Sequence, residues 1–250
     1  MAEATSLRET VVMLDISEIE RVLVVTAHPD DVDFGAAGTV ATLTDAGVEV
    51  VYCLVTDGQA GGFDHAVPRE EMASIRRQEQ TKAAAEVGVT DLRFLGHMDG
   101  EVEVTMDLRH DVSRVIREVR PQVVITQTPV RDLASTYRSH PDHTAVGEAT
   151  MCAVYPDARN PFAFAGRPAA GLEDWAVDEV WIMFDREGGS YVDITAAFER
   201  KIRALRCHES QHRDPDALEA RVREWWATIS EQHGVPAGTY IEPFFVVDTR

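Results

Sequence analysis

The sequence has little that would tie it to a membrane or to an oxidising compartment. Its 250 residues include only three cysteines, an odd number without C-x-x-C spacing, and Cys53 lies in an apolar run typical of a reduced core thiol. We find no basic-then-apolar signal at the start and no stretch of about 18 consecutive apolar residues. We therefore expect a cytoplasmic protein without membrane insertion.

Basic side chains are also scarce. The chain has 24 lysines and arginines against 43 acidic residues, which gives a net charge of −19. So acidic a surface repels the phosphates of nucleic acids and of anionic lipids. The charge argues against both as partners and favours a neutral or cationic small molecule; it leaves a homo-oligomer open.

The length and composition fit one globular domain, with 44% hydrophobic and 27% charged residues. Valine-rich or otherwise apolar runs predict buried strands, and the stretches between them have helical spacing. The expected strands are 22–26, 48–55, 92–95, 123–126, 177–184, 191–194 and 243–247, and the expected helices are 35–46, 70–87, 107–119, 142–155, 196–211 and 214–230.

This alternation of strands and helices implies right-handed crossovers and a mainly parallel sheet. We expect a Rossmann-like, three-layer α/β/α fold over residues 1–250, as a single domain. Residues 1–20 would form a leader and 156–176 a Pro/Gly-rich loop or lid, and the C-terminal region would wall the active site.

The first predicted strand runs directly into Ala27-His28-Pro29-Asp30-Asp31. Pro29 has no N–H for a strand ladder, so a turn should present His28, Asp30 and Asp31 at the carboxyl end of a parallel strand. Histidine and aspartate suit zinc and its first-row neighbours, and of two adjacent carboxylates one would bind metal while the other handles protons. The alternative is that these side chains only cap the next helix.

A second loop has the same composition. His140-Pro141-Asp142-His143 follows the strand predicted at 123–126, with Pro141 suited to the first position of a helix. His140 and His143 are three residues apart across that helix start and can point toward one centre. Two His-Pro-Asp elements, each after a buried strand, favour a shared metal site over simple helix capping.

These two loops resemble the signature motifs of the LmbE/PIG-L family of zinc-dependent N-deacetylases. The resemblance covers about residues 20–247. Its further blocks are Thr56-Asp57-Gly58, Arg76-Arg77-Gln78-Glu79, Phe94-Leu95 to Asp99-Gly100, Lys201 to His208-Glu209-Ser210-Gln211, and Tyr240-Ile241-Glu242-Pro243-Phe244.

The resemblance implies a role for each residue of the two loops. His28, Asp31 and His143 would ligate a divalent metal, usually Zn2+, although Fe2+ would accept the same ligands, and would leave an open position for water. Asp30 would be the general base. His140 would stabilise the oxyanion or protonate the leaving amine.

Arg76 and Asp99 fall where family members contact the substrate, so the resemblance makes both substrate-binding residues. The alternatives are an exposed helix arginine paired with a carboxylate and a turn residue before a glycine. Asp33 and Asp57 would either orient a metal-binding histidine or touch substrate. His208 is expected to support the structure.

The activity implied is removal of an acetyl group from an N-acetylglucosamine-like amide by attack of a metal-bound water, with a small amino-sugar substrate. One alternative is an amidase that cleaves a glucosamine-containing thiol S-conjugate. Another is a non-catalytic metal-binding accessory protein, which would not need Asp30 and His140. A dinucleotide-dependent enzyme is disfavoured because the glycine-rich loop at 56–62 lacks the G-x-G-x-x-G pattern.

Overall fold

The computed structural model describes residues 12–134, 136, 139–167, 171–184 and 189–250. In this part of the chain, eight strands form one sheet in the order β1-β7-β8-β6-β5-β2-β3-β4. They are β1 Val12–Met13, β2 Arg21–Thr26, β3 Glu49–Thr56, β4 Asp91–His97, β5 Val123–Gln127, β6 Glu179–Met183, β7 Ser190–Asp193 and β8 Ile241–Asp248. Only β8 runs antiparallel to its neighbours, β6 and β7. The mainly parallel α/β fold is confirmed.

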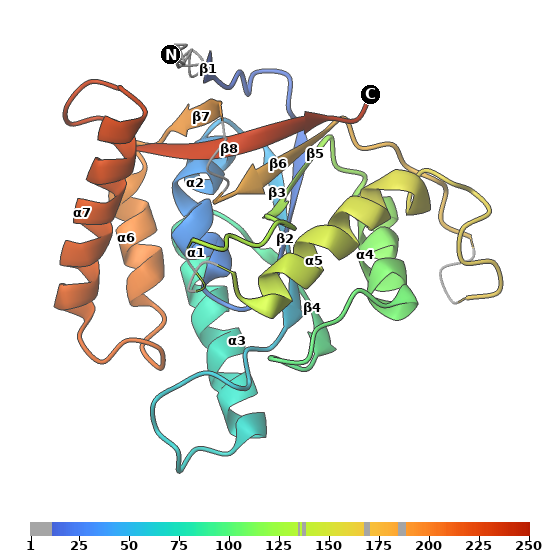
Figure 1. The fold of residues 1–250 in the computed structure, drawn as a ribbon, viewed down its shortest axis with the longest axis horizontal. Helices are drawn as coiled ribbons and strands as arrows, with labels where there is room; N and C mark the ends of the chain where they lie inside the picture. The colour runs from blue at the N-terminus through green and yellow to red at the C-terminus, as the bar shows by residue number, and fades with distance from the viewer. Residues whose placement is uncertain (1–11, 135, 137–138, 168–170, 185–188) are drawn as a thin grey trace, which may run out of the picture.

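Helices cover both faces of the sheet (Figure 1). They are α1 Asp31–Gly35, α2 Ala37–Asp45, α3 Arg69–Glu86, α4 Met106–Val119, α5 Pro141–Cys152, α6 Phe198–Arg206 and α7 Pro215–Gln232, and a π-helical turn, Ala153–Asp157, follows α5. None of these helices is both long and apolar enough to cross a bilayer.

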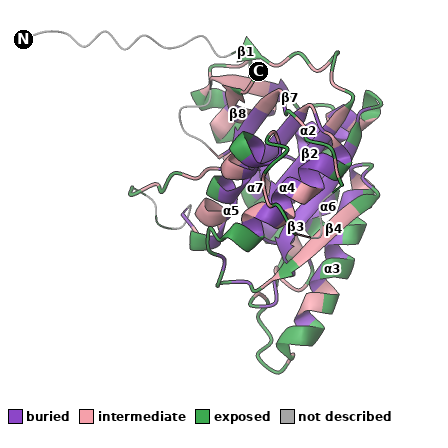
Figure 2. Cartoon of the chain, turned by 90° about the vertical axis from the view of Figure 1, so that its right-hand side faces the viewer, coloured by how far each residue is buried: buried purple, intermediate pink, exposed green. Residues whose placement is uncertain are grey.

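The central strands are buried on both faces, as the lack of polar alternation predicts, and Figure 2 shows them in purple. In β2, Val22 and Val24 belong to the core formed with α2, α3, α6 and α7. Leu23 and Val25 belong to the second core, formed with α4 and α5. Successive side chains of one strand thus fill two separate cores, which makes the three layers.

The C-terminal region lies against the loops at the carboxyl edge of the sheet. The side-chain oxygen of Gln211, after α6, accepts a hydrogen bond from the Gly62 amide at 3.1 Å. The His212 ring meets the Phe34 ring of α1 edge to face, with centroids 5.8 Å apart. These contacts agree with the expectation that the C-terminal region walls the active site.

The prediction of a single helix at 35–46 is wrong. The structure has two helices, which begin at Asp31 and Ala37 and are separated at Ala36, where φ is −143°. The Glu242 carboxylate, from β8, accepts hydrogen bonds from the amides of Gly38 and Thr39 and so caps the second helix. The expected helix at 196–211 is shorter and ends at Arg206.

Glu242 also forms a buried ion pair. The Lys201 ammonium lies 2.6 Å from a Glu242 oxygen and 2.6 Å from the Phe34 carbonyl, and both charged side chains are 0% exposed. The ammonium also lies over the Trp226 ring, 4.3 Å from its centroid. This pair joins α6, β8 and the end of α1, and therefore fixes the segment that carries Asp31.

Removing one partner of this pair should destabilise the fold strongly. We expect Lys201→Met to lower the free energy of unfolding by about 3–5 kcal/mol, because Glu242 would remain as an uncompensated buried charge. Urea denaturation measures the change. The matched control is Lys82→Met, at an exposed position of α3. Equal stability of the two variants would contradict a structural role for the pair.

Candidate active site

The metal motifs predicted from the sequence meet at the carboxyl edge of the sheet. Strand β2 pairs in parallel with β3 on one side and with β5 on the other. The loops that follow these strands therefore emerge side by side. His28 lies in the loop after β2, while His140 and His143 stand at the start of α5, after the loop that follows β5.

Donor atoms from the three predicted ligands converge. Nδ1 of His28 lies 3.2 Å from Nε2 of His143 and 3.3 Å from a carboxylate oxygen of Asp31. The other Asp31 oxygen lies 3.1 Å from Nε2 of His143. Ligands bound at about 2.0–2.1 Å in a tetrahedron are about 3.3–3.4 Å apart, so the spacing suits a small divalent ion.

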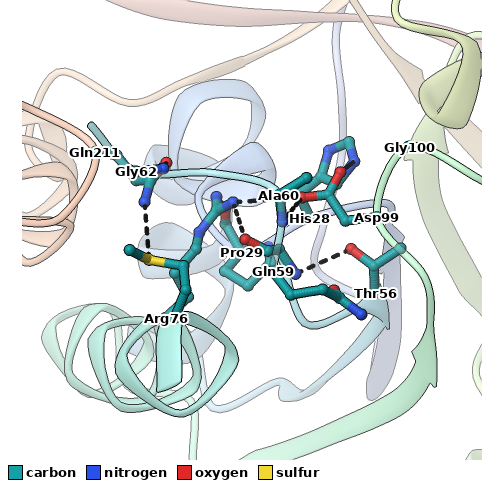
Figure 3. Close-up of polar contacts among 12 residues, drawn as sticks. His28, Pro29, Thr56, Gln59, Ala60, Gly62, Arg76, Asp99, Gly100 and Gln211 are labelled. Atoms are coloured by element: carbon teal, nitrogen blue, oxygen red, sulfur yellow. Dashed lines mark hydrogen bonds and ion pairs between the residues drawn. The ribbon is translucent and has the colours of Figure 1, made fainter. Parts of the chain in front are cut away.

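The other edge of the His28 ring contacts two carboxylates. Nε2 of His28 lies 3.0 Å from Asp142 and 3.1 Å from Asp99, and Figure 3 shows Asp99 beside the ring. Asp142 accepts the amide of Gly100 at 2.7 Å, and Asp99 accepts the amide of Ala60 at 2.9 Å. These carboxylates orient the imidazole and direct Nδ1 toward the donor cluster.

The carboxylates also raise the pKa of His28. Burial disfavours its imidazolium, but hydrogen bonds to Asp142 and Asp31 outweigh burial and raise the pKa of His28 to about 12. The carboxylates therefore favour a positive charge at this ring, which either a proton or a cation at Nδ1 would supply. The role of Asp142 was missed in the sequence, although the residue lies between the two histidines of the second motif.

Two groups of side chains each have donor atoms close enough together to share an ion. One is His28, His140 and His143, and the other is His28, Asp99 and Asp142. A cation in the second group would have to replace the hydrogen bonds that Nε2 of His28 makes with the two carboxylates. A cation on the Nδ1 side leaves those bonds in place. On that side, Nε2 of His143 and a carboxylate oxygen of Asp31 lie 3.2 and 3.3 Å from Nδ1 of His28.

Asp30 is half-buried and has an unusual backbone. Its φ is +90°, in the region that side chains with a Cβ rarely occupy. Burial raises the pKa of Asp30, the guanidinium of Arg76 opposes the shift, and the charge of Asp31 adds to it. A carboxylate with a raised pKa is a better proton acceptor, as a general base requires.

His140 lies beside the predicted ligands. Its ring centroid is 4.9 Å from that of His28 and 5.2 Å from that of His143. Burial and the charges of these two rings lower the pKa of His140. Nδ1 of His140 accepts the amide of Asp142 at 3.2 Å, so the neutral ring carries its proton on Nε2 and can donate it.

The two predicted substrate residues are buried. Arg76 is 4% exposed, and its guanidinium donates to the carbonyls of Gly58 and Pro29 and to the Asp30 carboxylate, as Figure 3 shows for Pro29. An exposed helix arginine, the alternative in the sequence, is therefore wrong. Asp99 is 8% exposed and contacts His28.

The remaining polar candidates contact other side chains. Asp57 forms a bidentate ion pair with Arg77, in which both hydrogen bonds are 2.7 Å long. Asp33 accepts hydrogen bonds from Gln80 and His208, all of them fully buried. His208 thus lies in the interior as a supporting residue.

A family model described as PIG-L, GlcNAc-PI de-N-acetylase, matches residues 23–154. Diacetylchitobiose deacetylase of Thermococcus kodakarensis is 35% identical over 229 residues, which cover 89% of this chain and 80% of the relative. The chain therefore belongs to the PIG-L family of deacetylases, as its two histidine motifs indicate.

Two further relatives also have names that identify deacetylases. The probable N-acetyl-alpha-D-glucosaminyl L-malate deacetylase 2 of Bacillus cereus is 35% identical over 202 residues, or 76% of this chain and 83% of the relative. The solved N,N'-diacetylchitobiose deacetylase from Pyrococcus horikoshii matches with a TM-score of 0.85 and 30% identity, over 94% of this chain and 86% of that one.

The contact between Asp142 and His28 predicts a change in metal affinity. Asp142→Asn keeps the size of the side chain but removes its charge, and should weaken zinc binding about 10- to 100-fold. Competition with a chromophoric chelator measures the affinity. Asp157→Asn is the matched control, because Asp157 is also buried but pairs with Arg109 instead. Equal affinities in both variants would refute the orienting role of Asp142.

Proposed function

We propose that the protein is a metal-dependent hydrolase that removes an acetyl group from an N-acetylglucosamine-like amide. The observation that carries the proposal is the convergence of donor atoms from His28, Asp31 and His143 beside Asp30 and His140. The relatives support the substrate class, since their names identify deacetylases of diacetylchitobiose and of an N-acetylglucosaminyl malate.

In this proposal, His28, Asp31 and His143 hold a divalent ion, zinc or ferrous iron. The bound ion supplies Lewis acidity that polarises the amide carbonyl and makes water more acidic. Asp30 takes the proton of the attacking water. His140 donates from Nε2 to the developing oxyanion or to the nitrogen of the leaving amine, which must depart protonated.

A non-catalytic metal-binding protein would have no use for Asp30 and His140, which disfavours that alternative.

Asp99 and Arg76 are the proposed substrate contacts. The Asp99 carboxylate can accept hydrogen bonds from sugar hydroxyls in addition to those it already accepts. Arg76 is the weaker candidate, because its guanidinium already donates to three protein groups.

Acetate release tests the proposal. The zinc-loaded protein should release acetate from N-acetylglucosamine derivatives such as N,N'-diacetylchitobiose. Asp30→Ala should lower kcat about 10²- to 10⁴-fold, because the general base is lost, while the zinc content stays the same. Coupled detection of acetate and metal analysis measure the two quantities.

Asp64→Ala, at an exposed position of the 57–68 loop, is the control and should keep full turnover. Unchanged turnover in Asp30→Ala would remove Asp30 from the mechanism. If the protein cleaved cysteine conjugates of glucosamine and released no acetate from any N-acetylglucosaminide, it would be the thiol-conjugate amidase and not a deacetylase.

A further inference from the structure

Helix α3 holds one peptide unit of the active-site turn at both ends. Arg76 donates a hydrogen bond to the Pro29 carbonyl, and Oε1 of Gln80 accepts the Asp30 amide at 2.8 Å. The carbonyl and the amide belong to the same peptide group. Arg76 and Gln80 are four residues apart, on one face of α3, so one helix fixes the plane of that peptide.

The peptide plane matters because it sets the backbone of Asp30. With φ at +90°, Asp30 is in a conformation that is strained for a residue other than glycine. Rotation of the Pro29–Asp30 peptide would return φ to negative values and relieve this strain. That rotation would also bring the Pro29 carbonyl against the Gln80 oxygen and the Asp30 amide against the Arg76 guanidinium. Both contacts are repulsive, so the strained conformation is retained.

The amide of Gln80 is itself held in one orientation. Its Nε2 donates to a carboxylate oxygen of Asp33 at 2.9 Å, and Nε2 of His208 lies 2.8 Å from the same oxygen. All three side chains are 0% exposed. Because an ionised carboxylate only accepts hydrogen bonds, Asp33 fixes the amide nitrogen on its side. The Gln80 oxygen must then face Asp30.

We infer that Gln80 is a positioning residue for the reaction: oriented by Asp33 and His208, it holds the Pro29–Asp30 peptide so that the Asp30 carboxylate keeps its place beside Asp31. This inference rests on the proposed function, in which Asp30 is the general base. Gln80 is completely buried and bonds only protein groups, so it acts through Asp30 and not on the substrate.

The test replaces Gln80 with a side chain of similar length that makes neither hydrogen bond. We expect Gln80→Met to lower kcat about 10- to 100-fold, because small displacements of a catalytic group have effects of this size. KM and zinc content should stay near the wild-type values. Gln78→Met, at an exposed position of the same helix, is the matched control and should leave kcat unchanged.

A conservative variant distinguishes the loss of these hydrogen bonds from misfolding. The protonated carboxyl of Gln80→Glu has the same acceptor and donor as the amide, so this variant should recover much of the kcat lost in Gln80→Met. Recovery supports the inference. An equal loss of kcat in both Gln80 variants, with both folded by thermal melting, would overturn it.

A double-mutant cycle separates positioning from general support of the fold. In the Asp30→Ala background, Gln80→Met should cause no further loss of kcat, because the group it positions is gone. The same fold-loss in both backgrounds, or wild-type kcat in Gln80→Met, would overturn the inference alone. Unchanged turnover in Asp30→Ala would instead overturn the proposed function on which it rests.

Discussion

The parallel pairing of β2 with β5 determines the distance between the two histidine motifs, and the site depends on it. Val22 to Val25 lie in register with Val123 to Thr126. Neighbouring strands are about 4.8 Å apart, so the loops that follow them start side by side. As a result His28 and His143, 115 residues apart in sequence, have ring nitrogens at 3.2 Å. The valine-rich strands are thus part of the function, since they fix where the donors meet.

The site also concentrates negative charge below the surface. Asp31, Asp99 and Asp142 are each no more than 8% exposed, and all three contact His28. Buried carboxylates are costly unless hydrogen bonds or cations compensate them. The amides of Ala60 and Gly100 provide part of the compensation, and a positive charge between His28, Asp31 and His143 would provide more. The orientation of His28 and the proposed affinity for a metal ion therefore depend on the same cluster.

Much of this arrangement could be predicted from the sequence, because the signals are local. The apolar runs located the strands, and the two His-Pro-Asp elements pointed to the carboxyl edge and to the family. The contacts that were missed depend on segments far apart in the chain. The break at Ala36 depends on Glu242, more than 200 residues away, and the role of Asp142 depends on His28, 114 residues away. For the same reason the burial of Arg76 could not be read from its helix alone.

Anomalous diffraction from crystals of the zinc-loaded protein would locate the bound ion. We expect one strong peak at the zinc edge, within bonding distance of Nδ1 of His28, Nε2 of His143 and a carboxylate oxygen of Asp31. A peak on the opposite side of His28, between Asp99 and Asp142, would show that the ion binds to other ligands, and the absence of any peak near these residues in crystals that contain zinc would refute a metal site here.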